Sequence, residues 1–309
     1  MHNTKVNSKK VLNIAIIVYA IIFVAGIVFA IFGGINLDIN FKGGTKISYS
    51  YEGKIAEKDF KAVIDENIKA KYKLGQSTSL AGDTQTYDIS LVGKKSIKAS
   101  DLEKLTKGLT EKFNDSKIEL YNSNSVSPSV AGSFFAKSLV AVLITAILVV
   151  IYVGIRFKRI GGVTAALTAL VALVLDVFVS FFVCIFFGLQ IDANFIAVVL
   201  TLLGYSLNDT IVVYDRVREN RGLNPDMAIN DVLNMSISQS LIRNIVTTVT
   251  TLLAVITIVV VSEIYGLTTL RSFAIPMAFG LASGCVSSLF IAGPIWVCWQ
   301  EKKAKKFEA

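Results

Sequence analysis

Residues 194–220 read NFIAVVLTLLGYSLNDTIVVYDRVREN, a long apolar run that passes into a polar and charged segment. The part before Asn208 is largely apolar, which is typical of a helix that crosses a lipid bilayer. Asp209 lies inside the span, about 9 Å from a cytoplasmic end near Asp215 at a rise of about 1.5 Å per residue. An ionised carboxylate at that depth needs a partner, a proton or water. The stretch therefore predicts a transmembrane helix that carries a chemically active group.

Five further apolar segments are long enough to cross the hydrocarbon layer, which takes about 20 residues. Together with the first they predict six transmembrane helices, at residues 11–33, 134–155, 162–187, 194–215, 241–262 and 272–299. The composition agrees, because 53% of the 309 residues are hydrophobic and only 17% are charged. The first helix is expected to remain as an anchor, since its apolar run is too long for a signal peptide.

Lysine and arginine residues beside the spans predict the orientation of the chain. Short loops rich in these residues stay in the cytoplasm. The basic groups all fall on one side of the predicted membrane: Lys9 and Lys10, residues 156–159, residues 216–221 and Lys302–Lys306. We therefore expect a multi-pass membrane protein with both termini, residues 1–10 and the basic tail 300–309, in the cytoplasm. The net charge of +8 then reflects topology and contact with membrane lipid, and no nucleic-acid partner is expected.

Residues 34–133 separate the first two spans and are expected to form a folded domain outside the cytoplasm. Alternating and helical spacings of apolar residues predict the order β-α-β-β-α-β, the ferredoxin-like split motif. The expected elements are a strand at 44–51, a helix at 56–72, strands at 78–80 and 85–92, a helix at 99–113 and a strand at 117–122. The predicted fold class is a membrane all-α bundle of six transmembrane helices, five of them in residues 134–299, with one extracytoplasmic α+β domain.

Several kinds of chemistry are not expected from this sequence. The three cysteines lie in apolar runs without CxxC spacing, which predicts neither a disulfide nor a zinc site. The single histidine is His2, and Gly43-Gly44 lacks the rest of a phosphate-binding loop. We therefore expect no metal and no cofactor, and a protein that is not an enzyme.

A second intramembrane charge, Arg243, lies in the fifth predicted span at a depth similar to that of Asp209. An arginine there costs from about 3 to more than 10 kcal/mol. Pairing with Asp209 would offset much of this cost, so we expect the two side chains to meet across the helix interface. Two interpretations stay open: the pair locks two helices together, or Asp209 accepts and releases a proton. Arg243 also begins a hydroxyl-rich stripe, formed with Thr247, Thr250, Thr251, Ala254 and Thr257.

Other polar residues are candidates for a supporting role. Tyr205, Asn208, Thr210 and Thr247 lie near the expected pair on the same two spans. Asp176 is also deep, in the third span, and it is either a carboxylate bonded to neighbouring hydroxyls or part of a proton relay. In the sixth span Gly280, Gly284 and Ser288 have the small-xxx-small spacing that is typical of close helix packing.

Three segments resemble the SecF branch of the SecD/SecF family. They are residues 37–45, LDINFKGGT, after the first span, residues 204–220 in the fourth, and residues 243–253, RNIVTTVTTLL, in the fifth. The six-span layout matches over the whole chain. The sequence departs from the family pattern at Asn244, where threonine is expected, and at Leu175, where histidine is usual.

The resemblance implies one half of a transporter of the resistance-nodulation-division superfamily, completed by a SecD-like subunit. It implies that the external domains bind unfolded exported polypeptide while protons flow inward, and that Asp209 and Arg243 match residues implicated in proton passage. It implies the SecYEG channel, with YidC and SecA, as further partners. Sodium instead of protons stays open as the coupling ion. Two alternative functions also stay open, a passive assembly factor of the translocon and an efflux half-transporter.

Overall fold

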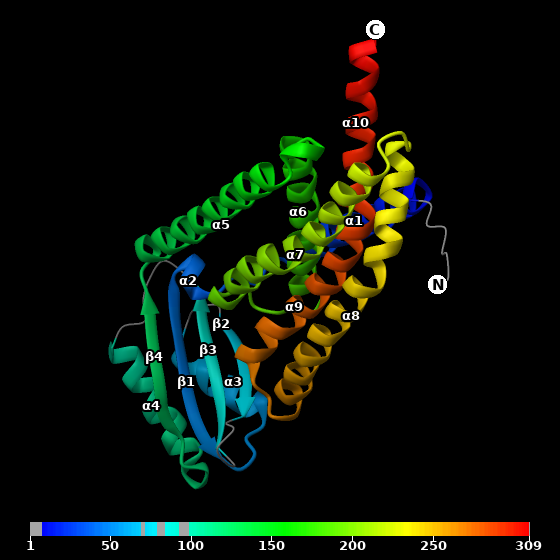
Figure 1. Cartoon of the computed structure of the whole chain (residues 1–309). Coiled ribbons are helices and arrows are strands. Elements are labelled where there is room, and N and C mark those ends of the chain that lie inside the picture. The colour runs from blue at the N-terminus through cyan, green and yellow to red at the C-terminus, as the bar shows by residue number, and fades with distance from the viewer. Residues whose placement is uncertain (1–7, 69–71, 79–83, 93–98, 309) are drawn as a thin grey trace.

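A computed structural model describes residues 8–68, 72–78, 84–92 and 99–308. The molecule consists of a bundle of long helices with a small four-stranded sheet at one end (Figure 1). In the chain, the sheet falls between the first and second long helices.

Six helical segments of the described chain are long and apolar enough to cross a membrane, as predicted. Five are single helices: α1 (Ser8–Gly33), α5 (Pro128–Arg156), α6 (Gly162–Phe186), α7 (Ala193–Leu223) and α8 (Ile229–Ile264). The sixth joins α9 (Thr268–Ser287), a π-helical turn (Ser288–Ala292) and α10 (Gly293–Glu308). Helices α7 and α8 are longer than predicted, because polar residues continue each helix beyond its apolar run.

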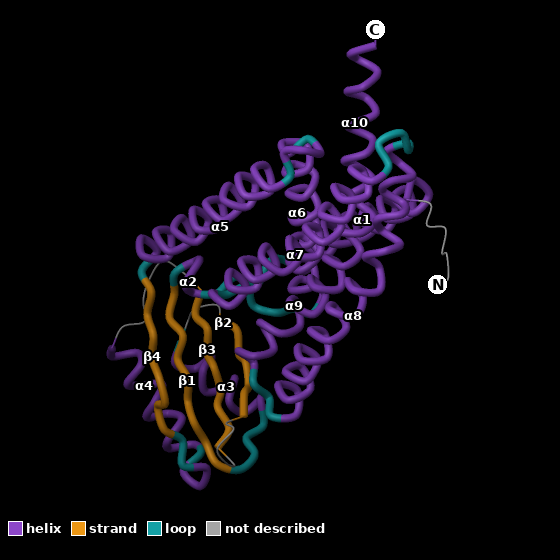
Figure 2. The backbone as a smooth tube through the Cα atoms, viewed as in Figure 1, coloured by secondary structure: helices purple, strands orange, loops and turns teal. Residues whose placement is uncertain are grey.

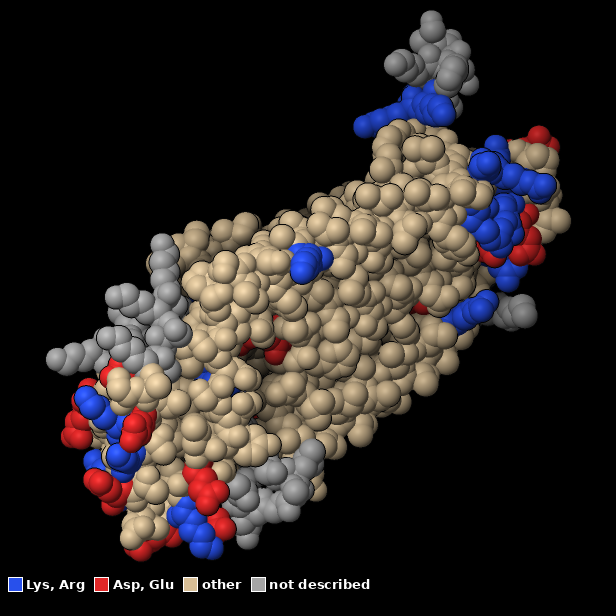
Figure 3. Space-filling model, turned by 90° about the vertical axis from the view of Figure 1, so that its left-hand side faces the viewer, with Lys and Arg blue, Asp and Glu red and all other residues tan. Residues whose placement is uncertain are grey.

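Charged side chains gather at the two ends of the molecule on the face shown in Figure 3. The long middle part of that face is almost free of them. Helices α1 and α5 expose many large apolar side chains, among them Ile14, Ile21, Leu143 and Ile147. An apolar belt between two charged ends is the surface that a bilayer requires.

The sheet is antiparallel with the strand order β2-β3-β1-β4. Its elements follow one another as β1 (Gly44–Glu52), α3 (Glu57–Asn67), β2 (Tyr72–Thr78), β3 (Thr84–Val92), α4 (Ala99–Lys112) and β4 (Glu119–Val126). Helices α3 and α4 lie on one face of the sheet (Figure 2). Their apolar faces form a core with the strands, in which Tyr49, Phe60, Ile64, Leu105 and Leu109 are fully buried. This end of the molecule therefore has a hydrophobic core of its own.

Several predicted boundaries in this part are wrong. The last strand was expected at residues 117–122, but β4 runs from Glu119 to Val126. Helix α3 was expected to reach Tyr72, but it ends at Asn67, and Tyr72 pairs with Leu91 at the start of strand β2. The strand expected at residues 78–80 corresponds to β2, which ends at Thr78, while residues 79–83 lie outside the described part. Helical spacing through Ile68 concealed the break, since Ile68 is buried although its backbone is extended.

The sheet is joined to the bundle by a short connection that includes α2 (Ile39–Lys42). Leu37 forms a parallel bridge with Ile191 in the α6–α7 loop, and the amide of Asp38 donates to the carbonyl of Ile191 at 3.0 Å. Gly43 and Gly44 follow with φ values of 75° and 143°. A Cβ at Gly44 would overlap the carbonyl oxygen of Leu91, and a Cβ at Gly43 would lie 3.0 Å from Pro128. Glycine is therefore required at both positions, because the chain turns there and its backbone passes close to Leu91 and Pro128.

Candidate functional site

Asp209 lies on α7 and faces α8, with only 1% of its surface exposed. Its Oδ2 accepts a hydrogen bond from the hydroxyl of Thr248 at 3.3 Å. Its backbone oxygen accepts from the side-chain amide of Asn244 at 3.3 Å. Asn244 and Thr248 are one helical turn apart and both are buried, so together they form the face of α8 that covers Asp209.

The expected pair of Asp209 and Arg243 is not formed in this structure. Arg243 is exposed, and the ion pairs of the described residues do not include it. The reason is the rotation of α8: residue 243 precedes Asn244 by about 100° around the helix, and Asn244 occupies the buried face. The threonine stripe is turned outward with Arg243. Thr247, Thr250 and Thr257 are exposed and donate to backbone carbonyls of their own helix.

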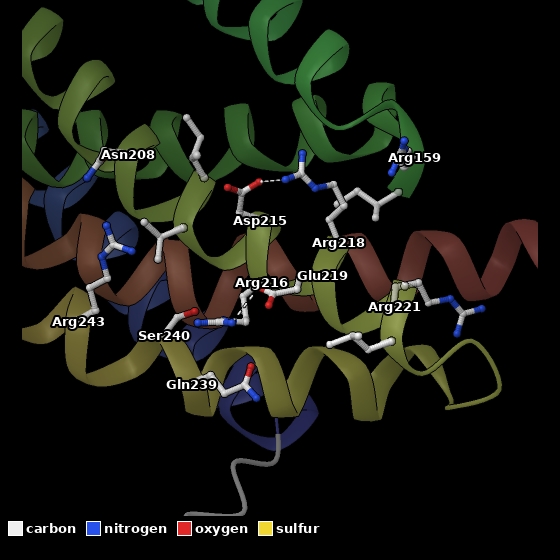
Figure 4. Close-up of a pocket in the computed structure, with 15 residues that line it drawn as sticks. Arg159, Asn208, Asp215, Arg216, Arg218, Glu219, Arg221, Gln239, Ser240 and Arg243 are labelled. Atoms are coloured by element: carbon white, nitrogen blue, oxygen red, sulfur yellow. Dashed lines mark hydrogen bonds and ion pairs between the residues drawn. The ribbon is translucent and has the colours of Figure 1, made fainter.

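A cavity of about 820 Å³ lies between the α5–α6 connection, α7 and α8. Asn208 and Arg243 lie at one end of it and Arg221 at the other (Figure 4). Its remaining charged lining residues are Arg159, Asp215, Arg216, Arg218 and Glu219. Asn208, the residue before Asp209, lines the cavity, whereas Asp209 itself faces Asn244 and Thr248 of α8.

The cavity is positively charged. Arg216 pairs with Glu219 at 2.8 Å, and Arg218 pairs with Asp215 at 2.9 Å. Arg159, Arg221 and Arg243 form no ion pair with a carboxylate among the described residues. Three guanidinium groups therefore remain to attract negative charge into the cavity.

A second buried carboxylate, Asp176 of α6, is surrounded by hydroxyl groups. Ser283 donates to its Oδ1 at 2.6 Å, and Ser206 and Ser287 donate to its Oδ2 at 2.7 and 2.9 Å. The Tyr19 hydroxyl from α1 lies 2.7 Å from the Ser283 hydroxyl. Neighbouring hydroxyls were one expectation for Asp176, but Tyr19, Ser206, Ser283 and Ser287 were not predicted to provide them. The sequence contained one sign of these partners. Ser283 and Ser287 are four residues apart, so they lie on the same face of their helix.

Close packing brings these hydroxyls together. A Cβ at Gly284 would lie 3.0 Å from the Ser206 hydroxyl and 3.5 Å from Asp176 Oδ2. A Cβ at Gly280 would overlap both Ser180 and Leu202. The small residues of α9 therefore let α6, α7 and α9 approach closely, as their spacing predicted.

Comparison with known proteins identifies the family. Residues 106–302 match the family described as "Protein export membrane protein SecD/SecF, C-terminal". The chain belongs to the SecD/SecF family. The matched part contains both carboxylates and every hydroxyl donor described above except that of Tyr19.

Relatives match over nearly the whole chain. The protein translocase subunit SecF of Alicyclobacillus acidocaldarius is 32% identical over 289 residues, which cover 92% of this chain and 90% of that protein. The SecF of Petrotoga mobilis is 32% identical and covers 96% of this chain and 95% of its own. The SecDF of Bacillus subtilis is 34% identical over 93% of this chain, which corresponds to 37% of the longer protein.

Solved SecDF structures share the fold. The crystal structure of SecDF from Thermus thermophilus matches 97% of this chain with a TM-score of 0.78 and 24% identity. A SecDF structure in a super-membrane-facing form matches with a TM-score of 0.66 and 24% identity. This chain spans 38% and 39% of those chains. It is therefore a SecF-like chain in a family that also contains longer SecDF proteins.

The supporting residues predicted from sequence do not gather around Asp209 as a group. Thr210 donates to the Ser288 hydroxyl of the π-helical turn at 2.9 Å. The Tyr205 hydroxyl lies 2.8 Å from that of Thr251 and donates to the carbonyl of Thr247 at 2.9 Å. These contacts tie α7 to its neighbours, while Asn208 lines the cavity.

One side of α7 in this SecD/SecF chain is left uncovered. Ala197, Thr201, Gly204 and Asn208 follow at three- and four-residue spacing, and all four are exposed. A Cβ at Gly204 would meet no atom within 4 Å. We call these four residues the small-residue stripe of α7. It lies at a membrane depth where polar groups normally face protein or water.

Proposed function

We propose that this chain works with a SecD-like subunit to promote late steps of protein translocation across the bacterial cell membrane, driven by the proton motive force. The observation that carries this proposal is the position of Asp209. It is an almost fully buried carboxylate in the middle of a membrane helix, with no ion pair to any described residue. Such a group can exist neutral or charged, and it can therefore take up and release a proton.

The cavity supports this role for Asp209. It extends from Asn208 along α7 to Leu223, the last residue of the helix, and is lined by polar and charged groups. Water in the cavity would give a proton a short path between Asp209 and one side of the membrane. Arg243 keeps a proposed part as a cation at the Asn208 end of this path, and in this conformation it forms no ion pair with Asp209.

The small-residue stripe supports a partner. Small residues let two membrane helices approach closely and form polar contacts across the interface. We infer that a SecD-like subunit packs on this stripe and on the outward-facing threonines of α8. The resemblance adds the SecYEG channel, YidC and SecA as partners of the assembly, and unfolded exported polypeptide as the substrate of the external domain.

We infer the orientation from the distribution of charge. The basic ends of α5, α7 and α10 are placed in the cytoplasm together with both termini. The domain of residues 34–133, which we take to be ferredoxin-like, is then outside. The chain forms no covalent bond in this role, so we do not propose an enzyme activity.

The dependence of export on the ion gradient tests the proposal. Inverted membrane vesicles with and without this chain are supplied with ATP and an exported precursor, and the increase in export that the chain provides is measured. We expect that increase to disappear when a protonophore collapses the proton gradient. An increase that survives collapse would favour a passive assembly factor, and an increase that follows only an imposed sodium gradient would identify sodium as the coupling ion.

A further inference from the structure

The Asp176 site satisfies a carboxylate with hydroxyl groups alone. Asp176 is completely buried and forms no ion pair with a described lysine or arginine. The titratable groups that interact with the site are Tyr19 from α1, Asp209 from α7 and Cys285 from α9, none of which carries a positive charge. The carboxylate therefore depends on three hydroxyl donors when it is charged.

One of these donors has a second acceptor within reach. The Ser287 hydroxyl lies 2.9 Å from Asp176 Oδ2 and 3.2 Å from the backbone oxygen of Gly284. A hydroxyl carries one proton, so it donates to only one of these oxygens at a time. When it donates to Gly284, its lone pairs are free to accept a hydrogen bond from the direction of Asp176.

We propose that Asp176 is a second proton-binding site of this chain, and that Ser287 is the hydroxyl that keeps both protonation states of Asp176 hydrogen-bonded. In the charged state Ser206, Ser283 and Ser287 all donate to the carboxylate. In the neutral state a proton forms an O–H bond at Oδ2 and is donated to the Ser287 oxygen, while Ser287 donates to Gly284. Every buried polar atom named here keeps a hydrogen-bond partner in both states. Protonation therefore does not incur the free-energy cost of leaving a buried polar atom without a partner.

The site links helices that the proposed function uses. Ser206 lies three residues before Asp209 on α7, and Ser283 and Ser287 lie on α9. Protonation weakens the bonds from these two helices to α6, because a neutral carboxyl is a poorer acceptor than a charged one. The inference does not depend on Asp209 carrying a proton, because proton binding at Asp176 is measured without any export.

Infrared difference spectroscopy tests this inference on the chain purified with its partner in lipid vesicles. Spectra are compared between mildly acidic and mildly alkaline pH. We expect a protonated-carboxyl C=O band that appears at acidic pH, shifts in heavy water and is absent from the Asp176→Asn variant. In Ser287→Ala the band should move to a different frequency, because the hydrogen-bond acceptor of the carboxyl proton has been removed.

Ser180→Ala is the matched control. Ser180 is also fully buried, but it donates to the backbone oxygen of Asp176 at 3.1 Å and not to its carboxylate. Its removal should leave the band unchanged. An Asp176-dependent band that is present at every pH, or absent at every pH, would overturn the proposal, as would a band that is unaffected by Ser287→Ala. The Ser287 and Ser180 variants retain the carboxylate, so they test the site even where Asp176→Asn assembles poorly.

Discussion

Vesicles that contain the Asp209→Asn variant are expected to lose their gradient-dependent export, by tenfold or more, while export driven by ATP hydrolysis alone continues at its basal rate. Asparagine keeps the size of the side chain and an oxygen that can accept from Thr248, but it cannot take up and release a proton. Because Asp209 forms no ion pair with Arg243 here, the substitution leaves no arginine without a countercharge. The variant should therefore accumulate to nearly normal amounts and assemble normally.

Asp215→Asn is the matched control for this prediction. It makes the same chemical change on the same helix, at a residue that is partly exposed and paired with Arg156 and Arg218 at the cavity. It should retain most of the gradient-dependent export, since exposed ion pairs contribute little energy. Equal losses in both variants would point to the charge of the cavity and not to a proton carrier. Reduced abundance of Asp209→Asn, with normal export per assembled molecule, would favour a structural lock.

Replacing Gly204 by leucine is expected to reduce the amount of SecD-like subunit that copurifies with the chain in detergent by tenfold or more. Gly204 lies in the middle of the small-residue stripe, and a larger side chain there would keep a partner helix from approaching α7. Within this chain the substitution meets open space. Leucine also favours a helix more than glycine does, by about 1 kcal/mol. A loss of partner would therefore come from the interface and not from unfolding.

Gly132→Leu serves as the control for the interface prediction. Gly132 is an exposed helical glycine on α5, outside the small-residue stripe. A Cβ at this position would meet no atom within 4 Å. This variant should copurify with the partner as the unchanged chain does. If Gly204→Leu copurifies equally well, the stripe does not contact the partner, and another face of the bundle must do so.

The long helices were predictable from the sequence because the requirement for them is local. A bilayer demands an apolar run of sufficient length in each helix, and all six runs are visible in the residues themselves. The boundary between α3 and β2 was not visible in this way. Ile68 continues the helical spacing of Phe60 and Ile64, yet the pairing of Tyr72 with Leu91 decides where the next strand begins.

The Asp209 site shows a different limit. The sequence gives the depth of a residue along a helix, and on depth alone Arg243 and Asp209 match. It does not give the rotation of α8 about its own axis, which the packing of the whole bundle sets. A difference of one residue, about 100°, places Asn244 against Asp209 and turns Arg243 into the cavity.

The hydroxyl partners of Asp176 were hidden for a related reason. Ser206 and Ser287 come from helices that follow Asp176 by 30 and 111 residues in the chain. Which residues meet depends on how closely α6, α7 and α9 pack, and the glycines of α9 control that distance. The spacing of Gly280 and Gly284 predicted close packing, but not what it would bring together.

If Asp209 carries the proton, replacing it must stop the flow of protons through the complex. Purified complex is reconstituted into vesicles that contain a pH-sensitive dye, a pH difference is imposed, and proton entry is recorded while an exported polypeptide is moving. We expect the unchanged complex to show proton entry that depends on the moving polypeptide, and the Asp209→Asn complex to show none above that of protein-free vesicles. Equal proton entry through both complexes would mean that Asp209 is not the proton carrier.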